Sequence, residues 1–483
     1  MKIKLLVLIF MVGLTRFTSA QLPNEVYKTP LKEVLIDIER RYDIKIEYTT
    51  KFHEGLVKGI DVLFPTWRYR VDVDSTITNI LEPLFIEFVK TGEKKYQLTD
   101  FSYYRQPVEE GIKRLDHLLA SYPTLQIWEA RKAELRKCFM EQWRLSPFPR
   151  KTPLNPIYTT KRVMDGYTIE NVAIETLPGV YLCGSLYRPA KGRGPFPAVL
   201  SPHGHFGHYD TDPNEYGRYR PDQQYRCATL ARMGAVVFSY EMFGWGESLL
   251  QVRKEDHRTG LAATMQILNS IRVTDFLTSL SFVDPKRIGV TGGSGGGTQS
   301  FFLTAVDDRI TVSVPVVMLS YSFFGACPCG NGLPVYACSD LGTNNVEIAA
   351  MTAPRPMLVI SDGEDWTQNV PAIEFPYLQK VYGIYEKQQN VENVHLANEG
   401  HDYGLSKRLA MYDFMARHLG LNINAVKDKT GKIDESKCTI EKYDKMLIFG
   451  KEGNIPGNAV KGPDAIWTVL RSLQENMNSS PVF

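Results

Sequence analysis

The chain has 483 residues, of which 43% are hydrophobic and 23% are charged, as in an ordinary globular protein. This length exceeds what one hydrophobic core supports, so we expect two or three domains. A net charge of +2 excludes the strongly basic balance of a nucleic-acid-binding protein, and we expect no nucleic-acid partner.

The N-terminus has the pattern of an export signal. Lys2 and Lys4 precede an apolar run over residues 5–14, and small residues end at Ala20. We therefore expect a signal peptide over residues 1–20. No later stretch reaches about 18 apolar residues, so we expect no membrane span and an exported protein, periplasmic or secreted.

Residues 21–104 follow as a small α+β domain. A helical pattern over 31–38 precedes an alternating strand over 44–48. The arrangement repeats with a helix over 77–84 and a hairpin over 88–98. This part resembles the secretin and TonB N-terminal (STN) domain. The resemblance implies an envelope protein contact and no catalytic residues.

Two further segments flank the main domain. Residues 105–160 read as a helical linker, with helical periodicity over 107–143 followed by closely spaced prolines. Residues 426–483 read as a C-terminal extension with a helix over 465–473, which we expect to pack on the catalytic domain.

In residues 161–425, strands and helices alternate, as in a mostly parallel sheet covered by helices on both faces. The fold class is therefore α/β, and the active site is expected beyond the carboxyl ends of the strands. The expected strands are 168–175, 180–187, 198–200, 235–240, 287–291, 312–318, 356–360 and 394–396, and the expected helices are 223–233, 261–280, 298–305 and 406–419.

Ser294 is the candidate nucleophile. Residues 292–296 read Gly-Gly-Ser-Gly-Gly and match the G-x-S-x-G pattern between a strand and a helix. Glycines at this turn avoid clashes with the strand and the helix, and the serine is presented beside a helix N-terminus. The pattern by itself also fits a glycine-rich packing turn, so its meaning depends on a base and an acid further along the chain.

An acid and a histidine follow in the required order. The loop after the strand 356–360 contains Asp362, Glu364 and Asp365. We favour Asp365 as the orienting acid and keep Asp362 as the alternative. His401 lies in a glycine-bounded loop before the last helix of the domain, and we interpret it as the general base.

The oxyanion of an acyl-transfer reaction needs backbone donors. We assign one to the N–H of Gly295 and the other to His205, in the loop after the strand 198–200. The three spaced histidines of that loop also suggest metal ligands, but we expect no metal and no cofactor.

The seven cysteines are compatible with an oxidising compartment. Cys327, Cys329 and Cys338 lie close together in the sequence, and a local disulfide that uses Cys338 is the preferred interpretation. Zinc is the alternative, although the C-x-x-C spacing is absent and no histidine is near in the sequence. We expect the other cysteines to be packing residues: Cys138, Cys183, Cys227 and Cys438.

The catalytic region resembles the α/β-hydrolase carbohydrate esterases, the acetylxylan esterases and pectin methylesterases. The residues that carry the resemblance are His203-Gly204-His205, Gly244-Trp245-Gly246-Glu247-Ser248, Arg272–Leu277, Val283–Val290, Ala353-Pro354-Arg355-Pro356 and Gly400-His401-Asp402. The resemblance implies the α/β-hydrolase fold and a serine esterase of plant cell-wall polysaccharides. One departure is Asp362, which stands where related enzymes often have glycine.

Five side chains are candidates for substrate binding. Aromatic rings stack on sugars, and arginines pair with uronate carboxylates. The candidates are Trp245, Arg218, Arg220, Trp366 and Tyr403. We therefore expect a methyl-esterified pectin substrate, with acetylated xylan as the alternative. A serine peptidase of the prolyl-oligopeptidase type would share the triad, but its β-propeller does not fit into the residues upstream.

Overall fold

The computed structural model describes residues 28–48, 61–63, 70, 72–81, 86–100, 107–207, 212–325, 327, 329 and 335–478. The expected signal peptide lies outside the described residues. By its internal contacts the chain divides into two compact units, residues 1–82 with 88–99 and residues 83–87 with 100–483. No helix among the described residues combines the length and the apolar character needed to cross a membrane.

The N-terminal unit contains the expected helix–strand repeats. Its helices are α1 (Leu31–Tyr42) and α3 (Val73–Leu81), and its strands are β1 (Lys28–Pro30), β2 (Lys45–Tyr48), β3 (Asp61–Leu63), β4 (Ile86–Gly92) and β5 (Lys95–Asp100). Strands β4 and β5 form the expected hairpin, β2 pairs with β5 in parallel, and β1 pairs with β3. The buried face of α1 comes from an apolar stripe that includes Leu31, Leu35 and Ile38.

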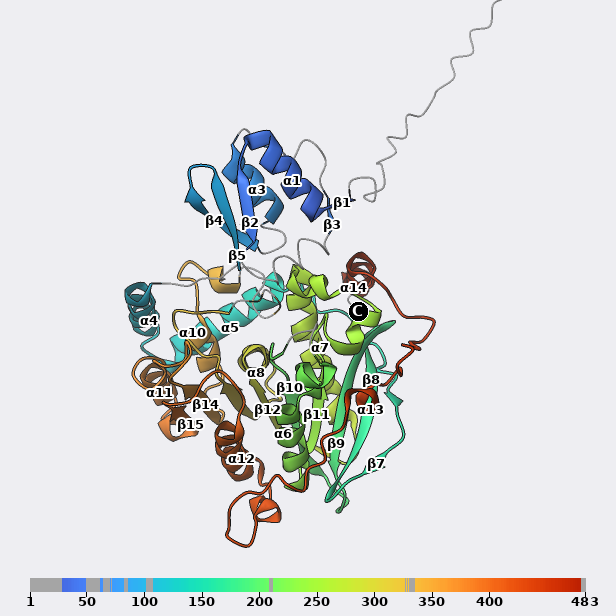
Figure 1. Ribbon diagram of the computed structural model, residues 1–483. Helices are drawn as coiled ribbons and strands as arrows, with labels where there is room; N and C mark the ends of the chain where they lie inside the picture. Colours follow the sequence, from blue (N-terminus) through green and yellow to red (C-terminus); the bar gives the residue numbers. More distant parts are fainter. Residues whose placement is uncertain are drawn as a thin grey trace, which may run out of the picture. The chain divides into compact units, whose positions relative to one another are not determined.

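The second unit is built around a ten-stranded sheet (Figure 1). Five parallel pairings join the six strands from β15 to β11, and the remaining strands are antiparallel. The strands are β6 (Ile157–Tyr158), β7 (Arg162–Val163), β8 (Tyr167–Leu177), β9 (Val180–Pro189), β10 (Phe196–Pro202), β11 (Val236–Tyr240), β12 (Val283–Gly293), β13 (Val312–Val316), β14 (Met357–Asp362) and β15 (Val391–Leu396). Their order is β15-β14-β13-β12-β10-β11-β9-β8-β6, with β7 beside β8. The mostly parallel sheet and the α/β-hydrolase fold are confirmed.

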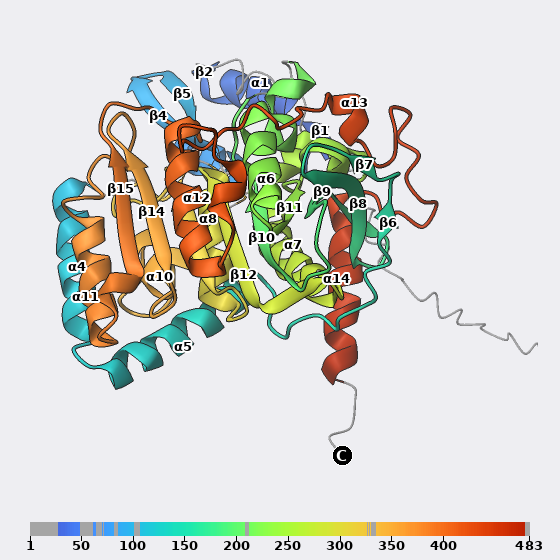
Figure 2. The same cartoon turned by 90° about the horizontal axis from the view of Figure 1, so that it is seen from below.

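Helices cover both faces of this sheet (Figures 1 and 2). The helices are α4 (Val108–Ser121), α5 (Leu125–Gln142), α6 (Pro221–Arg232), α7 (Gly260–Ser279), α8 (Gly295–Val306), α10 (Asn345–Ala350), α11 (Glu374–Ile384), α12 (Leu405–Leu419), α13 (Tyr443–Met446) and α14 (Pro463–Asn478). Alternation along β10 shows the two faces: Ala198 and Leu200 join the core under α7 and α8, whereas Val199 joins the core under α6 and α12.

The flanking segments belong to the same core. Helices α4 and α5, which we expected to be a linker, bury Leu118, Trp128 and Phe139 in the core under α7 and α8. Helix α14, drawn in red beside α7 in Figures 1 and 2, buries Ile466 and Leu470 there. These segments therefore extend the hydrolase core.

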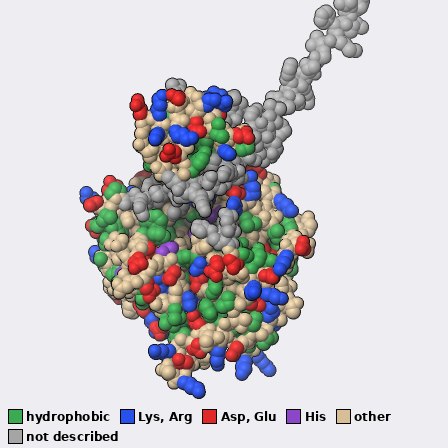
Figure 3. Space-filling view, viewed as in Figure 1, with side chains coloured by type: hydrophobic (Ala, Val, Ile, Leu, Met, Phe, Trp, Pro, Cys, Tyr) green, Lys and Arg blue, Asp and Glu red, His purple; other side chains and the backbone are tan. Residues whose placement is uncertain are grey.

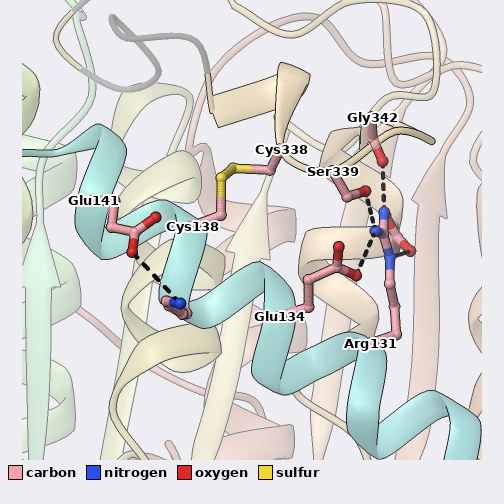
Figure 4. Close-up of a disulfide and its surroundings, with 9 residues drawn as sticks. Arg131, Glu134, Cys138, Glu141, Cys338, Ser339 and Gly342 are labelled. Carbon is pink, nitrogen blue, oxygen red and sulfur yellow. Dashed lines mark hydrogen bonds and ion pairs between the residues drawn. A yellow bond between two sulfur atoms is a disulfide. The ribbon is translucent and has the colours of Figure 1, made fainter.

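The cysteine prediction was wrong for Cys338. This residue forms a disulfide with Cys138 of α5, across a sequence separation of 200 residues (Figure 4). Cys138 is therefore no ordinary packing residue. Beside the disulfide, Arg131 of α5 donates two hydrogen bonds of 2.9 and 3.0 Å to Glu347, and the two side chains are 6% and 0% exposed. The sequence pattern could not show these contacts because they join distant segments.

Replacing both Cys138 and Cys338 with serine should lower the stability of the second unit. A cross-link across about 200 residues restricts the unfolded chain strongly, and loss of such a disulfide typically costs about 2–5 kcal/mol. Denaturant unfolding of the double variant measures the loss, with Cys438→Ser, a buried free cysteine elsewhere, as the control. Equal stability of the double variant and the wild type, or alkylation of both thiols in the unfolded, unreduced wild type, would contradict the expectation.

Candidate active site

Ser294 occupies a strained turn between β12 and α8. Its φ of 54° and ψ of −121° lie in a region that non-glycine residues rarely adopt. The neighbouring glycines make room for the turn. A Cβ atom on Gly292 would lie 2.6 Å from backbone atoms of Gly296, and one on Gly296 would lie 2.6 Å from the carbonyl oxygen of Pro202. The sequence from 292 to 296 therefore forms a sharp strand-to-helix turn of the kind that presents the nucleophile in α/β-hydrolases.

His401 and Asp365 meet at the same edge of the sheet. They follow β15 and β14, which run parallel to each other and to β12. The Nδ1 atom of His401 lies 2.6 Å from Oδ2 of Asp365. The carboxylate is 3% exposed and the imidazole 27%. A buried carboxylate at Nδ1 orients the ring and leaves Nε2 for proton transfer.

Thr367 completes the support of Asp365. Its backbone N–H and its hydroxyl donate hydrogen bonds of 2.5 and 2.6 Å to Oδ1 of Asp365. Burial alone would raise the pKa of Asp365, but the hydrogen bonds from His401 and Thr367 outweigh it and hold this pKa below its usual value. Asp365 is therefore ionised when it faces the imidazole.

Asp362, the alternative acid, has another partner. Its Oδ2 lies 3.3 Å from Nζ of Lys407, and both side chains are fully buried. Burial and the charge of Asp365 raise the pKa of Asp362 to about 6, against the effect of Lys407. Lys407 also donates hydrogen bonds of 2.7 Å to the carbonyl of Gly400 and to Asp402, the two neighbours of His401. The Asp362–Lys407 pair thus lies beneath the histidine loop, and Asp365 is the acid that contacts the ring.

Aromatic rings border the imidazole. The ring of Trp366 lies 4.4 Å and that of Phe206 lies 5.4 Å from the His401 ring, between centroids. Phe206 also reaches the turn of the candidate nucleophile, since a Cβ atom on Gly293 would lie 3.2 Å from its ring. Ser294 and His401 are therefore brought to a shared aromatic neighbour, although they are 107 positions apart in the sequence.

The expected oxyanion residues also lie together. Gly295 is the first residue of α8, where backbone N–H groups have no partner within the helix. A Cβ atom on Gly295 would lie 2.5 Å from Nδ1 of His205, so the two residues are in close contact. His203 shapes the same loop, because its Nδ1 donates to the carbonyl of Gly204 and its Nε2 accepts from the N–H of Met242. Burial lowers the pKa of His203 to about 3, so this ring is neutral.

Three substrate-binding predictions were wrong. Arg218 is fully buried, where it pairs with Glu241 at 2.9 Å and Glu247 at 3.3 Å. Trp245 is 4% exposed and packs against the rings of the oxyanion loop. Tyr403 is 1% exposed, and its hydroxyl is hydrogen-bonded to Thr291 at 2.7 Å. These side chains support the site from behind and offer no surface to a sugar.

Two of the predicted side chains remain accessible. Trp366 is half-buried beside His401, and Arg220 is 25% exposed, with its guanidinium 5.4 Å from the ring of Phe206. Sequence reasoning missed Thr367 and Lys407. An Asp-x-Thr spacing is a signal for the first, because a threonine two residues after an aspartate readily donates to it. No local signal marks the second.

Comparisons with known proteins place the chain in a family. No protein-family model matches it. The solved structure of Methylesterase BT1017 is 41% identical, with a TM-score of 0.71, and the similarity covers 95% of this chain and 100% of that one. The chain belongs to the family of Methylesterase BT1017. The expected resemblance to esterases is confirmed to that extent.

Two curated relatives are more distant. The hydrolase YtaP of Bacillus subtilis is 34% identical over 135 residues, which are 26% of this chain and 45% of that protein. The 4-O-methyl-glucuronoyl methylesterase of Neurospora crassa is 24% identical over 270 residues, which are 50% of this chain and 63% of that protein. The chain thus spans less than two thirds of the curated relatives that it matches.

The raised pKa of Asp362 predicts a pH-dependent stability. The pKa of this carboxyl is 3.8 in the unfolded chain and about 6 in the folded protein, so the folded protein binds the proton more tightly. The resulting contribution to the free energy of unfolding is fully present below pH 4. This contribution is lost as the pH rises to 6, so the stability of the wild type relative to Asp362→Asn should fall across that window. Unfolding measured at several pH values checks this. A constant difference between the two proteins from pH 4 to pH 6 would contradict the raised pKa.

Proposed function

We propose that this protein is an exported serine carbohydrate esterase that hydrolyses methyl esters of pectin. The hydrogen bond of 2.6 Å between His401 and Asp365, at the edge of the sheet that presents Ser294, is the observation that carries the proposal. The family of Methylesterase BT1017 and the glucuronoyl methylesterase of Neurospora crassa support ester hydrolysis on a uronate.

The mechanism follows from the roles of the three residues. His401 takes the proton from Ser294, whose Oγ attacks the ester carbonyl of a uronate unit. The N–H groups of Gly295 and His205 stabilise the tetrahedral oxyanion. The oxyanion collapses, His401 gives the proton to the methoxy oxygen, and methanol leaves. Water, deprotonated by His401, then hydrolyses the uronyl ester on Ser294 and restores the enzyme. Asp365 holds the tautomer of His401 throughout.

The charge near the site is consistent with an anionic polymer. Arg220 donates a hydrogen bond to Asp222 through Nε. A substrate carboxylate would compete with Asp222 for this guanidinium. Its Nη1 also lies 3.3 Å from the carbonyl oxygen of Glu215, and the adjacent Phe206 borders His401. We infer that Arg220 contacts a uronate carboxylate that is not esterified, while Trp366 contacts a sugar ring beside the reacting ester.

The disulfide between Cys138 and Cys338 supports export, because disulfides persist in oxidising compartments such as the periplasm or the cell exterior.

For the N-terminal unit, whose helix–strand repeats resemble the STN domain, we propose an envelope protein contact. Basic and acidic side chains are interspersed on the face drawn in Figure 3, as on an ordinary protein surface.

Product release separates the substrate classes. The wild type should release methanol from methyl-esterified pectin, and Ser294→Ala should lose at least about 10⁴-fold in rate because the nucleophile is absent. Methyl glucuronate esters and acetylated xylan are assayed in parallel. Release of acetate from xylan without methanol from pectin would replace pectin methylesterase with acetylxylan esterase. Preferred cleavage of the methyl glucuronate ester would identify glucuronate, instead of the uronate of pectin, as the sugar that carries the cleaved ester. Hydrolysis of peptides alone would indicate a serine peptidase.

Substitution of the two aspartates distinguishes their roles. Asp365→Asn should reduce kcat about 10⁴-fold, because the imidazole loses the carboxylate that fixes its tautomer. Asp362→Asn is the matched control, since it removes a buried carboxyl three residues away, at the end of β14, that does not contact His401, and it should reduce kcat less than about tenfold. Steady-state kinetics on the cleaved ester measure both. A larger loss for Asp362→Asn than for Asp365→Asn would reverse the assignment.

A further inference from the structure

Four side chains of types that commonly bind metals converge at the oxyanion loop. His205 follows β10, His257 lies in a short 3₁₀ helix (Lys254–Arg258) before α7, and Cys327 and Cys329 follow β13. One ligand atom from each lies within 4.8 Å of all the others. We call this set the Cys/His cluster. In the described part of the chain it is the one group of three or more such side chains with this spacing.

The imidazoles direct the same nitrogen into the Cys/His cluster. Nδ1 of His257 lies 2.5 Å from the carbonyl oxygen of Phe243, so Nδ1 carries the proton and Nε2 presents a lone pair. Nε2 of His205 lies 2.9 Å from Nε2 of His257 and 3.0 Å from Sγ of Cys329. A metal-binding histidine typically donates its other N–H to a carbonyl or carboxylate, as His257 does here.

Burial limits the access of water to the cluster, so its polar atoms depend on one another or on a bound ion for partners. His257 is 5% and Cys329 is 1% exposed, whereas His205 and Cys327 are half-buried. A proton on Nε2 of His205 would form one hydrogen bond between the two facing nitrogens and leave the sulfurs with weak partners. A cation at the centre would bind all four atoms at once.

We propose that the Cys/His cluster binds one zinc ion. Two imidazoles and two thiolates are a common set for tetrahedral zinc, with bonds of about 2.0–2.3 Å. Such bonds hold the ligand atoms about 3.3–3.8 Å apart, which lies between the 2.9 Å that separates the two Nε2 atoms and the 4.8 Å limit of the set. All four positions are filled by protein, so the ion has a structural role and no position open for substrate.

This inference revises the expectation that the chain holds no metal. The sequence argument rested on the absence of C-x-x-C and of a histidine near the cysteines. The fold supplies both histidines from other loops, at sequence distances that no local motif covers. A disulfide between Cys327 and Cys329, which are free thiols in this structure, would be the competing use of these sulfurs.

Zinc at this position would also hold the oxyanion loop. A metal on Nε2 of His205 leaves the proton on Nδ1, which faces Gly295. The ion would therefore fix the loop that carries the second oxyanion donor against the start of α8. This step rests on the proposed function, whereas metal binding does not.

Metal content tests the proposal directly. The full chain, expressed with zinc and dialysed without chelator, should contain one zinc per chain by elemental analysis. Cys329→Ser and His257→Gln should lose most of it, and Cys438→Ser, a buried cysteine outside the cluster, should retain it. A wild type without zinc would overturn the proposal. Native peptide mapping that joins Cys327 to Cys329, or variants with unchanged zinc, would do the same.

If the cluster variants do not fold, cobalt replacement in the wild type tests the same site. The wild type is depleted with a chelator and reloaded with Co²⁺, which should give the visible bands of a tetrahedral ion and a thiolate-to-cobalt charge-transfer band. An octahedral spectrum without thiolate bands would exclude the Cys/His cluster as the site. Ser294→Ala separates this inference from the proposed function, because it should hold zinc in full while it lacks esterase activity.

Kinetics test the effect on the oxyanion loop. Zinc-depleted wild type that remains folded should show a kcat at least tenfold lower with KM nearly unchanged, because the oxyanion is stabilised only in the transition state. Restored zinc should restore kcat. An unchanged kcat in protein shown to be zinc-free would reject the positioning role, and metal content would still report on binding.

Discussion

The positive φ of Ser294 is the constraint on which the site depends. Such a backbone costs roughly 1–3 kcal/mol and persists only where the surroundings enforce it. Here the start of α8 lies so close to the oxyanion loop that Gly296 has no room for a Cβ beside Pro202. The same close approach of α8 to this loop brings Gly295 to His205. The proposed nucleophile and the proposed oxyanion donors are thus parts of one packing arrangement.

The buried charges beneath the histidine form a second arrangement. Asp362 and Asp365 are three residues apart, and their environments shift their pKa values in opposite directions. Asp365 is held ionised by His401 and Thr367, while Asp362 is compensated by Lys407, which also binds both neighbours of His401. Two acids three residues apart can therefore have different partners: Asp365 contacts the imidazole, and Asp362 at the end of β14 contacts the lysine that binds the histidine loop.

The sequence predicted what depends on local pattern and chain order. Strand, glycine turn and helix identified the position of Ser294, and the parallel sheet implied that the loops with Asp365 and His401 share its edge. It failed where a side chain's environment is set by distant segments. Arg218 was expected to bind substrate, yet it lies among Glu241, Glu247 and the carbonyl of Met446, which are brought together only by folding. Neither composition nor spacing distinguishes such an arginine from an exposed one.

The cysteines in the segment after β13 were also difficult to interpret from the sequence, because distant segments set their environment. Cys338 is joined to α5 by the disulfide, and Cys327 and Cys329 reach the oxyanion loop. The two attachments lie close together in the sequence, although their partners come from distant parts of the chain. Asn344 then caps α10, whose Glu347 pairs with Arg131 of α5. The positions of these sulfurs therefore depend on contacts with α5 and the oxyanion loop, which the spacing of the cysteines in the sequence does not reveal.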